Sequence, residues 1–261
     1  MSRKIRLIAR LDVKDDFLVK GIQYEGLRKL GDPHDFARRY YEQGIDEILY
    51  LDTVASLYER NNLGNILERT TADVFIPITA GGGLRSVQDV GAVLKSGADK
   101  AAVNTAALRR PALITEIARA FGSQCMLLSI RAKRRDPARP AAGWEAYYDN
   151  GREHSGKDVL EWAKEAVSLG AGEILLSSVD KEGFQKGMDQ ELIAAVADLV
   201  DVPVIAAGGA ACAEDVAAAA EGLADLTGYD AVAVGSILHY GKTDVPALKE
   251  EVRALGVEVR R

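Results

Sequence analysis

The sequence predicts a single (β/α)8 TIM barrel, in which eight parallel strands alternate with helices around a closed sheet. Short apolar runs alternate with longer segments of helical periodicity, there are eight such runs, and the second half of the chain repeats the first. The chain has 261 residues and no linker interrupts it, and barrels of about 250 residues fold as one unit. We therefore expect one domain over 1–261, built from half-barrels of about 1–122 and 123–261. An open doubly wound sheet is the alternative, but the near-equal halving favours closure.

The predicted strands are short apolar runs, and the segments between them carry apolar residues at i, i+3 and i+4. DPHDFARRYYEQG and PALITEIARAFG are examples of these helical segments, and several of them end at glycine. Each helix can therefore pack one face on the sheet. The expected strands lie near 5–12, 46–52, 74–80, 99–104, 124–130, 172–178, 202–207 and 231–235.

Two connections are longer than a barrel needs, and they occupy equivalent places in the two halves. DDFLVKGIQYEGLRKLGDP follows the first strand, and AKRRDPARPAAGWEAYYDNGREHSG follows the fifth. Active sites of such barrels lie at the carboxyl ends of the strands, so we expect mobile lids or substrate loops here. The second connection also predicts a small hairpin with Asn150 and Gly151 in its turn.

The repeat itself places glycine and hydroxyl residues after equivalent strands. EILYLDT, IPITAGGGL and GADKAAVNTAA in the first half match EILLSSV, VPVIAAGGA and GYDAVAVGSIL in the second, and Glu173 lies 126 residues (173 − 47) after Glu47. Glycine lets an anion approach the backbone closely. Either glycine run alone could be a tight turn, but the coincidence predicts two anion sites facing one cavity, and so a ligand with two phosphates. The residues concerned are Gly82, Gly83, Asn104, Thr105, Gly208, Gly209, Gly235 and Ser236.

Charged residues occupy the inward face of the first strand. Side chains alternate along a strand, so if Asp12 points into the barrel, Arg10 and Arg6 do as well. Buried charges need partners. For Arg6 the candidates are Glu47 and Glu173, which begin other strands, and Lys100 would complete a ring of two cations and two carboxylates. Such a ring is either a structural plug or a gate.

Composition excludes several classes of function. A net charge of −6 argues against a general nucleic-acid surface, and no apolar run approaches the roughly 18 residues of a membrane span. Cys125 and Cys212 lie far apart, which favours buried thiols in a reducing compartment, so we expect a cytoplasmic protein. His34, His154 and His239 lack zinc-ligand spacing and are expected to be solvated or structural. We expect no metal and no cofactor.

Several segments together carry a specific resemblance: LDVKD, VKG, GIDEILYLD, TAGGGL, GADKAAVNTAA, ITEIARAFGSQ, GAGEILL and the C-terminal GG pair. Along nearly its whole length the chain resembles the cyclase subunit of imidazole glycerol phosphate synthase. The resemblance implies a barrel in a heterodimer with a glutaminase, which docks on the N-terminal face and supplies ammonia. In that family the ammonia crosses the barrel and combines with a bisphosphorylated formimino-carboxamide ribotide. The products are imidazole glycerol phosphate and an aminoimidazole carboxamide ribotide.

The resemblance also implies roles for single residues. Asp12 matches the first catalytic aspartate, the general acid/base near the ring being closed, and Lys20 matches the lysine of the mobile first loop. Asp99 matches the position associated with communication to the glutaminase. The family's ammonia gate corresponds to Arg6, Glu47, Lys100 and Glu173, and its phosphate positions correspond to Gly83, Asn104, Thr105, Gly183, Gly209 and Ser236.

The chain departs from the family's pattern at four positions around the expected cavity. The second catalytic carboxylate is replaced by Arg131, whose guanidinium stays protonated and cannot exchange a proton. We expect Arg131 to lower the pKa of Asp12 or to bind an anionic group bidentately. Arg10 replaces a small residue, Glu182 an aspartate and Phe184 a hydroxyl residue. These departures predict a changed ligand behind a retained ammonia gate.

Three functions therefore stay open. The first is the ring-closing reaction of histidine biosynthesis. The second is a specialised amidation, since GLRKLGDP and LDTVASLYERNN resemble divergent relatives that work on surface sugars. The third is a catalytically silent scaffold that activates a glutaminase. A related phosphoribosyl isomerase would not need the four-charge gate. Trp144, Tyr147 and Tyr148 either cover the barrel mouth or pack the hairpin.

Overall fold

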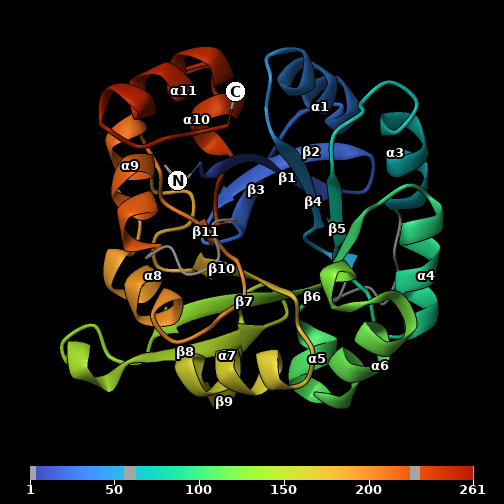
Figure 1. Cartoon of the computed structure of the whole chain (residues 1–261), viewed down its shortest axis with the longest axis vertical. Coiled ribbons are helices and arrows are strands. Elements are labelled where there is room, and N and C mark those ends of the chain that lie inside the picture. Colours follow the sequence, from blue (N-terminus) through green and yellow to red (C-terminus); the bar gives the residue numbers. More distant parts are fainter. Residues whose placement is uncertain (1–3, 56–62, 224–229, 261) are drawn as a thin grey trace.

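Eight parallel strands form a closed barrel in the computed structural model, which describes residues 4–55, 63–223 and 230–260 (Figure 1). Each strand pairs with its neighbour, and the pairing of β7 with β10 closes the ring. The predicted (β/α)8 barrel is confirmed, and the open sheet is wrong. The strands are β1 (Arg6–Lys14), β4 (Glu47–Asp52), β5 (Ile78–Gly81), β6 (Lys100–Val103), β7 (Met126–Arg134), β10 (Glu173–Ser178), β11 (Val204–Ala207) and β12 (Ala231–Val234).

The third predicted strand, 74–80, is misplaced at its start. β5 begins only at Ile78, because Pro77 has no backbone N–H to donate to a neighbouring strand. Upstream of the proline, Phe75 is 74% exposed, although its segment reads as an apolar run. The segment LDTVASLYERNN was noted for its resemblance to divergent relatives. Its residues 56–62 lie outside the described residues.

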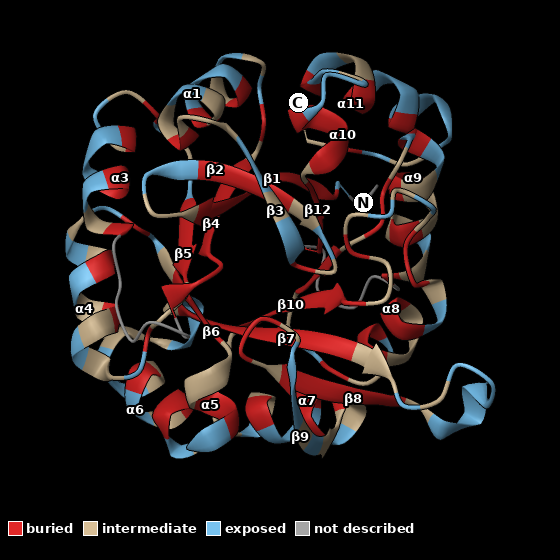
Figure 2. Cartoon of the chain, turned by 180° about the vertical axis from the view of Figure 1, so that it is seen from behind, coloured by how far each residue is buried: buried red, intermediate tan, exposed pale blue. Residues whose placement is uncertain are grey.

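Helices cover the outside of the barrel, and their buried faces point toward the sheet (Figure 2). Acidic or hydroxyl side chains begin several of them: Ser86 and Asp89 form a capping box, and the Asp158 side chain accepts from two backbone N–H groups. The helices are α1 (Pro33–Glu42), α3 (Leu63–Thr70), α4 (Val87–Lys95), α5 (Thr105–Arg109), α6 (Ala112–Phe121), α7 (Val159–Ser168), α8 (Gln190–Ala197), α9 (Ala213–Gly222), α10 (Ser236–His239) and α11 (Val245–Ala254), with 3₁₀ turns η1 (Ser123–Cys125) and η2 (Pro140–Ala142).

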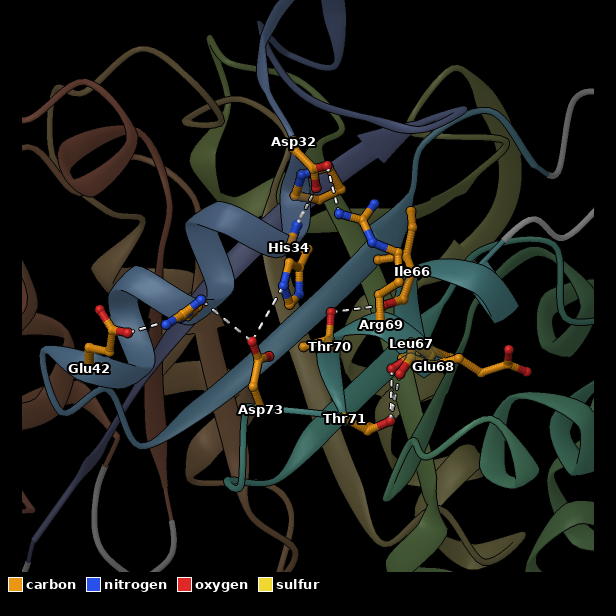
Figure 3. A network of polar contacts seen from close by, with 12 residues as sticks. Asp32, His34, Glu42, Ile66, Leu67, Glu68, Arg69, Thr70, Thr71 and Asp73 are labelled. Atoms are coloured by element: carbon orange, nitrogen blue, oxygen red, sulfur yellow. Dashed lines mark hydrogen bonds and ion pairs between the residues drawn. The ribbon is translucent and has the colours of Figure 1, made fainter.

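Polar contacts fix the start of α1 against α3 (Figure 3). The carboxylate of Asp32 accepts from the backbone N–H of His34 at 2.9 Å and from Nη2 of Arg69 at 2.9 Å. The ring of His34 lies 3.6 Å from Asp73. His34 is therefore a structural residue at the start of α1.

The apolar core has two parts, as the alternation of side chains along each strand requires. The larger part lies between the sheet and the helices. The smaller part fills the barrel itself and consists of Ile8, Leu49, Leu51, Ala102, Leu127, Leu175, Ile205, Ala207, Ala231 and Ala233. The interior is thus a packed layer of alanine, leucine and isoleucine side chains.

Both long connections form hairpins that extend a barrel strand. β2 (Phe17–Ile22) and β3 (Glu25–Gly31) continue β1, and β8 (Trp144–Tyr148) and β9 (Glu153–Asp158) continue β7. The second hairpin confirms the prediction; the first was expected only as a loop. Gln23 and Tyr24 have positive φ angles of 50° and 64°, and 126 residues later (149 − 23) Asp149 and Asn150 have 44° and 64°. The repeat therefore extends from the sequence to the backbone conformation of the two turns.

The cysteines were expected to be buried, and neither is. Cys125 is half-buried in η1, and Cys212 is exposed at the start of α9; both are free thiols. Within 4–55, 63–223 and 230–260, no helix is long and apolar enough to cross a membrane.

Candidate functional site

A ring of four charged side chains lies at the N-terminal end of the barrel. Arg6 donates through Nη1 to Glu47 at 2.7 Å and through Nη2 to Glu173. Lys100 completes the ring at 2.6 Å from Glu173 and 3.4 Å from Glu47. The first residues of β1, β4, β6 and β10 supply these side chains, so the start of each strand places them at one level.

The ring neutralises its own charge. Burial lowers the pKa of Arg6, but Glu173 and Glu47 offset this, and its pKa lies above the ordinary value. Arg6, Glu47 and Glu173 are buried, whereas the Lys100 side chain is 19% exposed. Lys100 is therefore the member that solvent reaches. This geometry is compatible with both a plug and a gate.

Asp99 has a local structural role beside the ring. Its carboxylate accepts from the backbone N–H of Ile78 at 2.8 Å, across the gap between β5 and β6. Asp46 and Asp230 hold the backbones of Leu7 and Val204 in the same way. Asp99 is exposed, so its expected contact with a partner is sterically open and stays a prediction.

A second four-charge ring lies at the opposite end of the barrel interior. Arg10 contacts Asp12 at 2.8 Å and Glu182 at 2.8 Å. Lys20, from β2, reaches the same two carboxylates, at 2.8 Å from Asp12 and 2.5 Å from Glu182. All four residues are buried. The sequence placed Asp12 and Arg10 on one face but contained no signal for this closed pairing with Glu182.

The apolar interior layer separates the two rings. We call them the lower ring (Arg6, Glu47, Lys100 and Glu173) and the upper ring (Arg10, Asp12, Lys20 and Glu182). Ile8 lies between Arg6 and Arg10 on the inward face of β1, and Leu175 follows Glu173 on β10. The barrel axis is therefore charged at both ends and apolar between them.

The upper ring holds Asp12 as a carboxylate. Burial alone raises the pKa of Asp12, but Arg10 and Lys20 outweigh it, and Arg131 acts in the same direction, so the pKa lies well below its usual range. The pKa of Glu182 is also lowered, because Arg10 and Lys20 offset its burial. Withdrawal of one of these cations would raise the pKa of Asp12.

Arg131 lies beside this ring without joining it. It is 6% exposed and forms no ion pair among the described residues; its Nη1 is buried and has no hydrogen-bond partner there. Its guanidinium lies 4.1 Å from the centre of the Tyr24 ring, which Arg10 contacts from 5.3 Å. The expected lowering of the Asp12 pKa is present, but Arg10 and Lys20 contribute more.

Two cavities of unequal size open at the carboxyl end of the barrel, where one shared cavity was expected. We name each cavity after the half of the chain that supplies its glycine run. The first-half cavity, with Gly82 and Gly83, has a volume of about 270 Å³, and the second-half cavity, with Gly208 and Gly209, about 20 Å³. A single water needs roughly 10–15 Å³ of such volume, so the second cavity is too small for a phosphate in this arrangement. Gly82, Gly83, Asn104, Thr105, Ser129, Arg131 and Asn150 line the first; Arg10, Lys20, Glu182, Gly183, Gly208, Gly209, Gly235 and Ser236 line the second.

The structure therefore brings each predicted set of phosphate residues together, while their role stays a prediction. Some of the glycines are also required by packing. A Cβ on Gly82, with φ 110°, would lie 2.4 Å from the backbone oxygen of Asp52, and one on Gly209, with φ 101°, would lie 2.2 Å from that of Gly187. Phe184 does not line the second cavity; it is exposed on the rim, so its link to a phosphate is not supported by position.

Hydrogen bonds hold the second hairpin on both halves of the barrel. Trp144 donates to Asp189 at 3.2 Å, and the backbone oxygen of Tyr147 accepts from Asn104 at 3.2 Å. The backbone N–H of Asp149 donates to Thr105 at 3.1 Å. Sequence reasoning did not find Ser129, Tyr24 or Asn150 as site residues, because isolated polar or aromatic residues in a strand or turn carry no distinctive spacing.

His239 is structural, but it lies next to the upper ring. Its Nε2 donates to the backbone oxygen of Arg10 at 2.9 Å, so its Nδ1 accepts from the Tyr40 hydroxyl at 2.8 Å. Burial and the charge of Lys20 lower the pKa of His239 to about 4. His154 is exposed in β9 and contacts Glu145. Across the described residues, no three His, Cys, Asp or Glu side chains are grouped to hold a metal ion.

Comparison with known proteins identifies the family of the chain. The family model described as histidine biosynthesis protein matches residues 6–244. Relatives named imidazole glycerol phosphate synthase subunit HisF include one from Legionella pneumophila, 57% identical over 78% of this chain and 95% of its own length. Another, from Myxococcus xanthus, is 48% identical over 98% of this chain and 97% of its own, and one from Mycobacteroides abscessus is 45% identical over 100% of both. The chain therefore belongs to the histidine biosynthesis protein family and, within it, to the imidazole glycerol phosphate synthase subunit HisF group.

Proposed function

We propose that this chain is the ammonia-using synthase, or cyclase, subunit of an imidazole glycerol phosphate synthase-type enzyme. The observation that carries the proposal is the lower ring of Arg6, Glu47, Lys100 and Glu173, which lies on the barrel axis opposite the cavities. Ammonia would enter at this ring and meet its acceptor at the carboxyl mouth. The relatives' names support the same reaction class.

The interior supports passage of ammonia rather than ammonium. A cation that left the ring would enter a layer of Ile8, Leu175 and other apolar side chains, where an unpaired charge costs several kcal/mol. Neutral ammonia pays far less of this cost. The ring and the apolar layer would therefore admit the nucleophilic form and exclude bulk cations.

A glutaminase docked over the lower ring is the proposed source of ammonia, giving a heterodimer. Lys100 is the ring member that solvent reaches, and Asp99 beside it is exposed, so both are available to a partner on this face. We place the complex in the cytoplasm, in keeping with the two free thiols.

At the mouth, Asp12 is the proposed general acid/base of ring closure, and Lys20 is the group that controls it. Lys20 lies on β2 of the first hairpin, so movement of that hairpin would withdraw one of the two cations that contact Asp12. Substrate that draws Lys20 onto a phosphate would raise the pKa of Asp12 and open the second-half cavity.

Transfer of ammonia to a different acceptor is the second candidate function. The observation that favours it is Arg131, which occupies the first-half cavity where the family's second catalytic carboxylate is expected. The specialised amidation of a sugar is one such reaction.

The test is turnover of the purified chain with an ammonium salt and the bisphosphorylated formimino-carboxamide ribotide. We expect slow product formation by the wild-type chain, a faster rate for Arg131→Asp, and a loss of about 100-fold for Asp12→Asn, since general acid/base groups contribute 10²–10⁴-fold. Asp12→Asn with unchanged overall product formation in the presence of a glutaminase partner would favour the scaffold. No product from either the wild-type chain or Arg131→Asp would favour a different acceptor.

A further inference from the structure

Arg131 stands out among the buried charges of the barrel. Arg6 and Arg10, on β1, each contact two carboxylates. Arg131 is equally buried and has none among the described residues. The nearby carboxylate of Asp12 contacts Arg10 and Lys20, and it forms no ion pair with Arg131 among the described residues.

The unpaired guanidinium faces the larger cavity. Arg131 lines the 270 Å³ first-half cavity, and one face of its guanidinium is covered by the Tyr24 ring. Ser129, two residues earlier on the same inward face of β7, lines this cavity too, and its buried hydroxyl has no partner in the described part of the chain. A buried cation and a buried hydroxyl, both unpaired and both at one cavity, indicate groups that a ligand satisfies.

The remaining walls place a phosphate in the same cavity. Gly82 and Gly83 present backbone at one side, with Asn104 beside them, whose Oδ1 is buried and unpartnered within the described residues. Arg109 lies at the rim, where Asp149 pairs with it at 2.9 Å. The cavity therefore offers a glycine cradle from the first half of the chain and a separate guanidinium from β7 of the second half.

The second-half cavity is too small to hold part of this ligand in the arrangement described. Lys20 and Glu182, at 2.5 Å, lie across this 20 Å³ cavity. Tyr24 contacts both Arg10, at 5.3 Å, and Arg131, at 4.1 Å from its ring centre.

We propose that Arg131 is a specificity-determining anion-binding residue, and that the first-half cavity binds a phosphate monoester carrying a second anionic group. The phosphate lies on the Gly82–Gly83 cradle and the second group, carboxylate or phosphate, lies on Arg131 as a bidentate partner. The proposal rests on the proposed function only in placing the substrate at this mouth. It concerns binding, which is measured without ammonia, so its failure is separable from failure of the ammonia reaction.

The experiment is calorimetric titration of the full-length chain with 3-phosphoglycerate and with glycerol 3-phosphate, which differ at the carboxylate. We expect 3-phosphoglycerate to bind about tenfold more tightly or better, as one charge-assisted pair provides. Arg131→Gln is expected to abolish this preference while glycerol 3-phosphate binds as before, and Arg131→Lys to retain part of it. Arg139→Gln, which removes an 82% exposed arginine, is the charge-matched control and should keep the preference.

Two further ligands distinguish the sources of the second anion. The affinity for 2,3-bisphosphoglycerate is compared in the same way. If Arg131→Gln weakens its binding as much as it weakens binding of 3-phosphoglycerate, Arg131 accepts phosphate as well as carboxylate. Inorganic phosphate should bind equally to the wild-type chain and to Arg131→Gln. Equal affinities of the wild-type chain for the two monophosphates, or a preference that survives Arg131→Gln in a variant with unchanged thermal unfolding, would overturn the proposal.

Discussion

Arg10 and Arg131 show how strongly the partners of one residue decide its meaning. Both are arginines buried at the barrel mouth, and both contact Tyr24. Arg10 is neutralised by Asp12 and Glu182, so it belongs to the scaffold. Arg131 lacks such partners among the described residues. The sequence could show that an arginine replaces a carboxylate, but only the side-chain positions separate a structural arginine from one available to a ligand.

Replacing Arg131 should stabilise the protein. An unpaired buried guanidinium costs free energy that an apolar side chain of similar length avoids. We expect Arg131→Met to raise the free energy of unfolding by about 1–2 kcal/mol in urea titrations without ligand, whereas Arg10→Met should lower it by about 3 kcal/mol, because it leaves two buried carboxylates short of a partner. A destabilised Arg131→Met would mean that the guanidinium is satisfied within the chain.

His239 should make stability depend on pH. Its pKa of about 4 in the folded state is below the unfolded value of about 6.5, so the unfolded chain binds more protons between these values and stability falls as pH falls through this window. From pH 7 to pH 5 the loss from this group is about 2 kcal/mol. His239→Gln, which retains a donor for the Arg10 backbone oxygen, should remove most of that loss in urea unfolding at the two pH values. An identical pH dependence in the variant would contradict the assignment.

The two hairpins differ in how far the sequence predicts them. The second was predictable because Asn150 and Gly151 are typical of a two-residue turn. The first has Gln23 and Tyr24 at its turn, both with positive φ angles, and neither residue type indicates that conformation. Contacts with the rest of the barrel hold it: the Gln23 N–H donates to the Glu182 backbone oxygen at 2.9 Å, and Lys20 joins the upper ring. Tertiary contacts, which a local pattern does not encode, determine this element.

The first hairpin should be released by a single methyl group. A Cβ on Gly183, with φ 78°, would lie 2.2 Å from the backbone oxygen of Gly21 in β2. We expect Gly183→Ala to destabilise the protein by about 2–4 kcal/mol and to raise hydrogen exchange across 17–31. Gly26→Ala is the matched control: it has a similar φ of 59° but open space, so it should cost about 1 kcal/mol and leave exchange elsewhere unchanged. Equal effects of the two variants would show that backbone strain, not contact with β2, matters at Gly183.

At the scale of the whole molecule, the barrel is a conduit with different ends. The strand pattern, the twofold repeat and the lower ring were all predictable from the sequence, because they follow from alternation of side chains along eight strands. The inequality of the two cavities was not, because it arises from Lys20 and Glu182 meeting across 162 positions of sequence separation. Lower ring, apolar layer and first-half cavity together form the path proposed for ammonia.

The most direct test of this path follows the nitrogen itself. The complex with its glutaminase is supplied with glutamine labelled with ¹⁵N at the amide and with unlabelled ammonium in the medium, and the isotope in the product is measured by mass spectrometry. We predict that product from the wild-type chain, and from the control Glu42→Gln on the outside of α1, carries mainly ¹⁵N at any ammonium concentration. Glu47→Gln, which breaks the lower ring, should shift the product toward the isotope ratio of the medium. A wild-type product whose isotope ratio simply follows the medium would contradict passage of ammonia through the barrel.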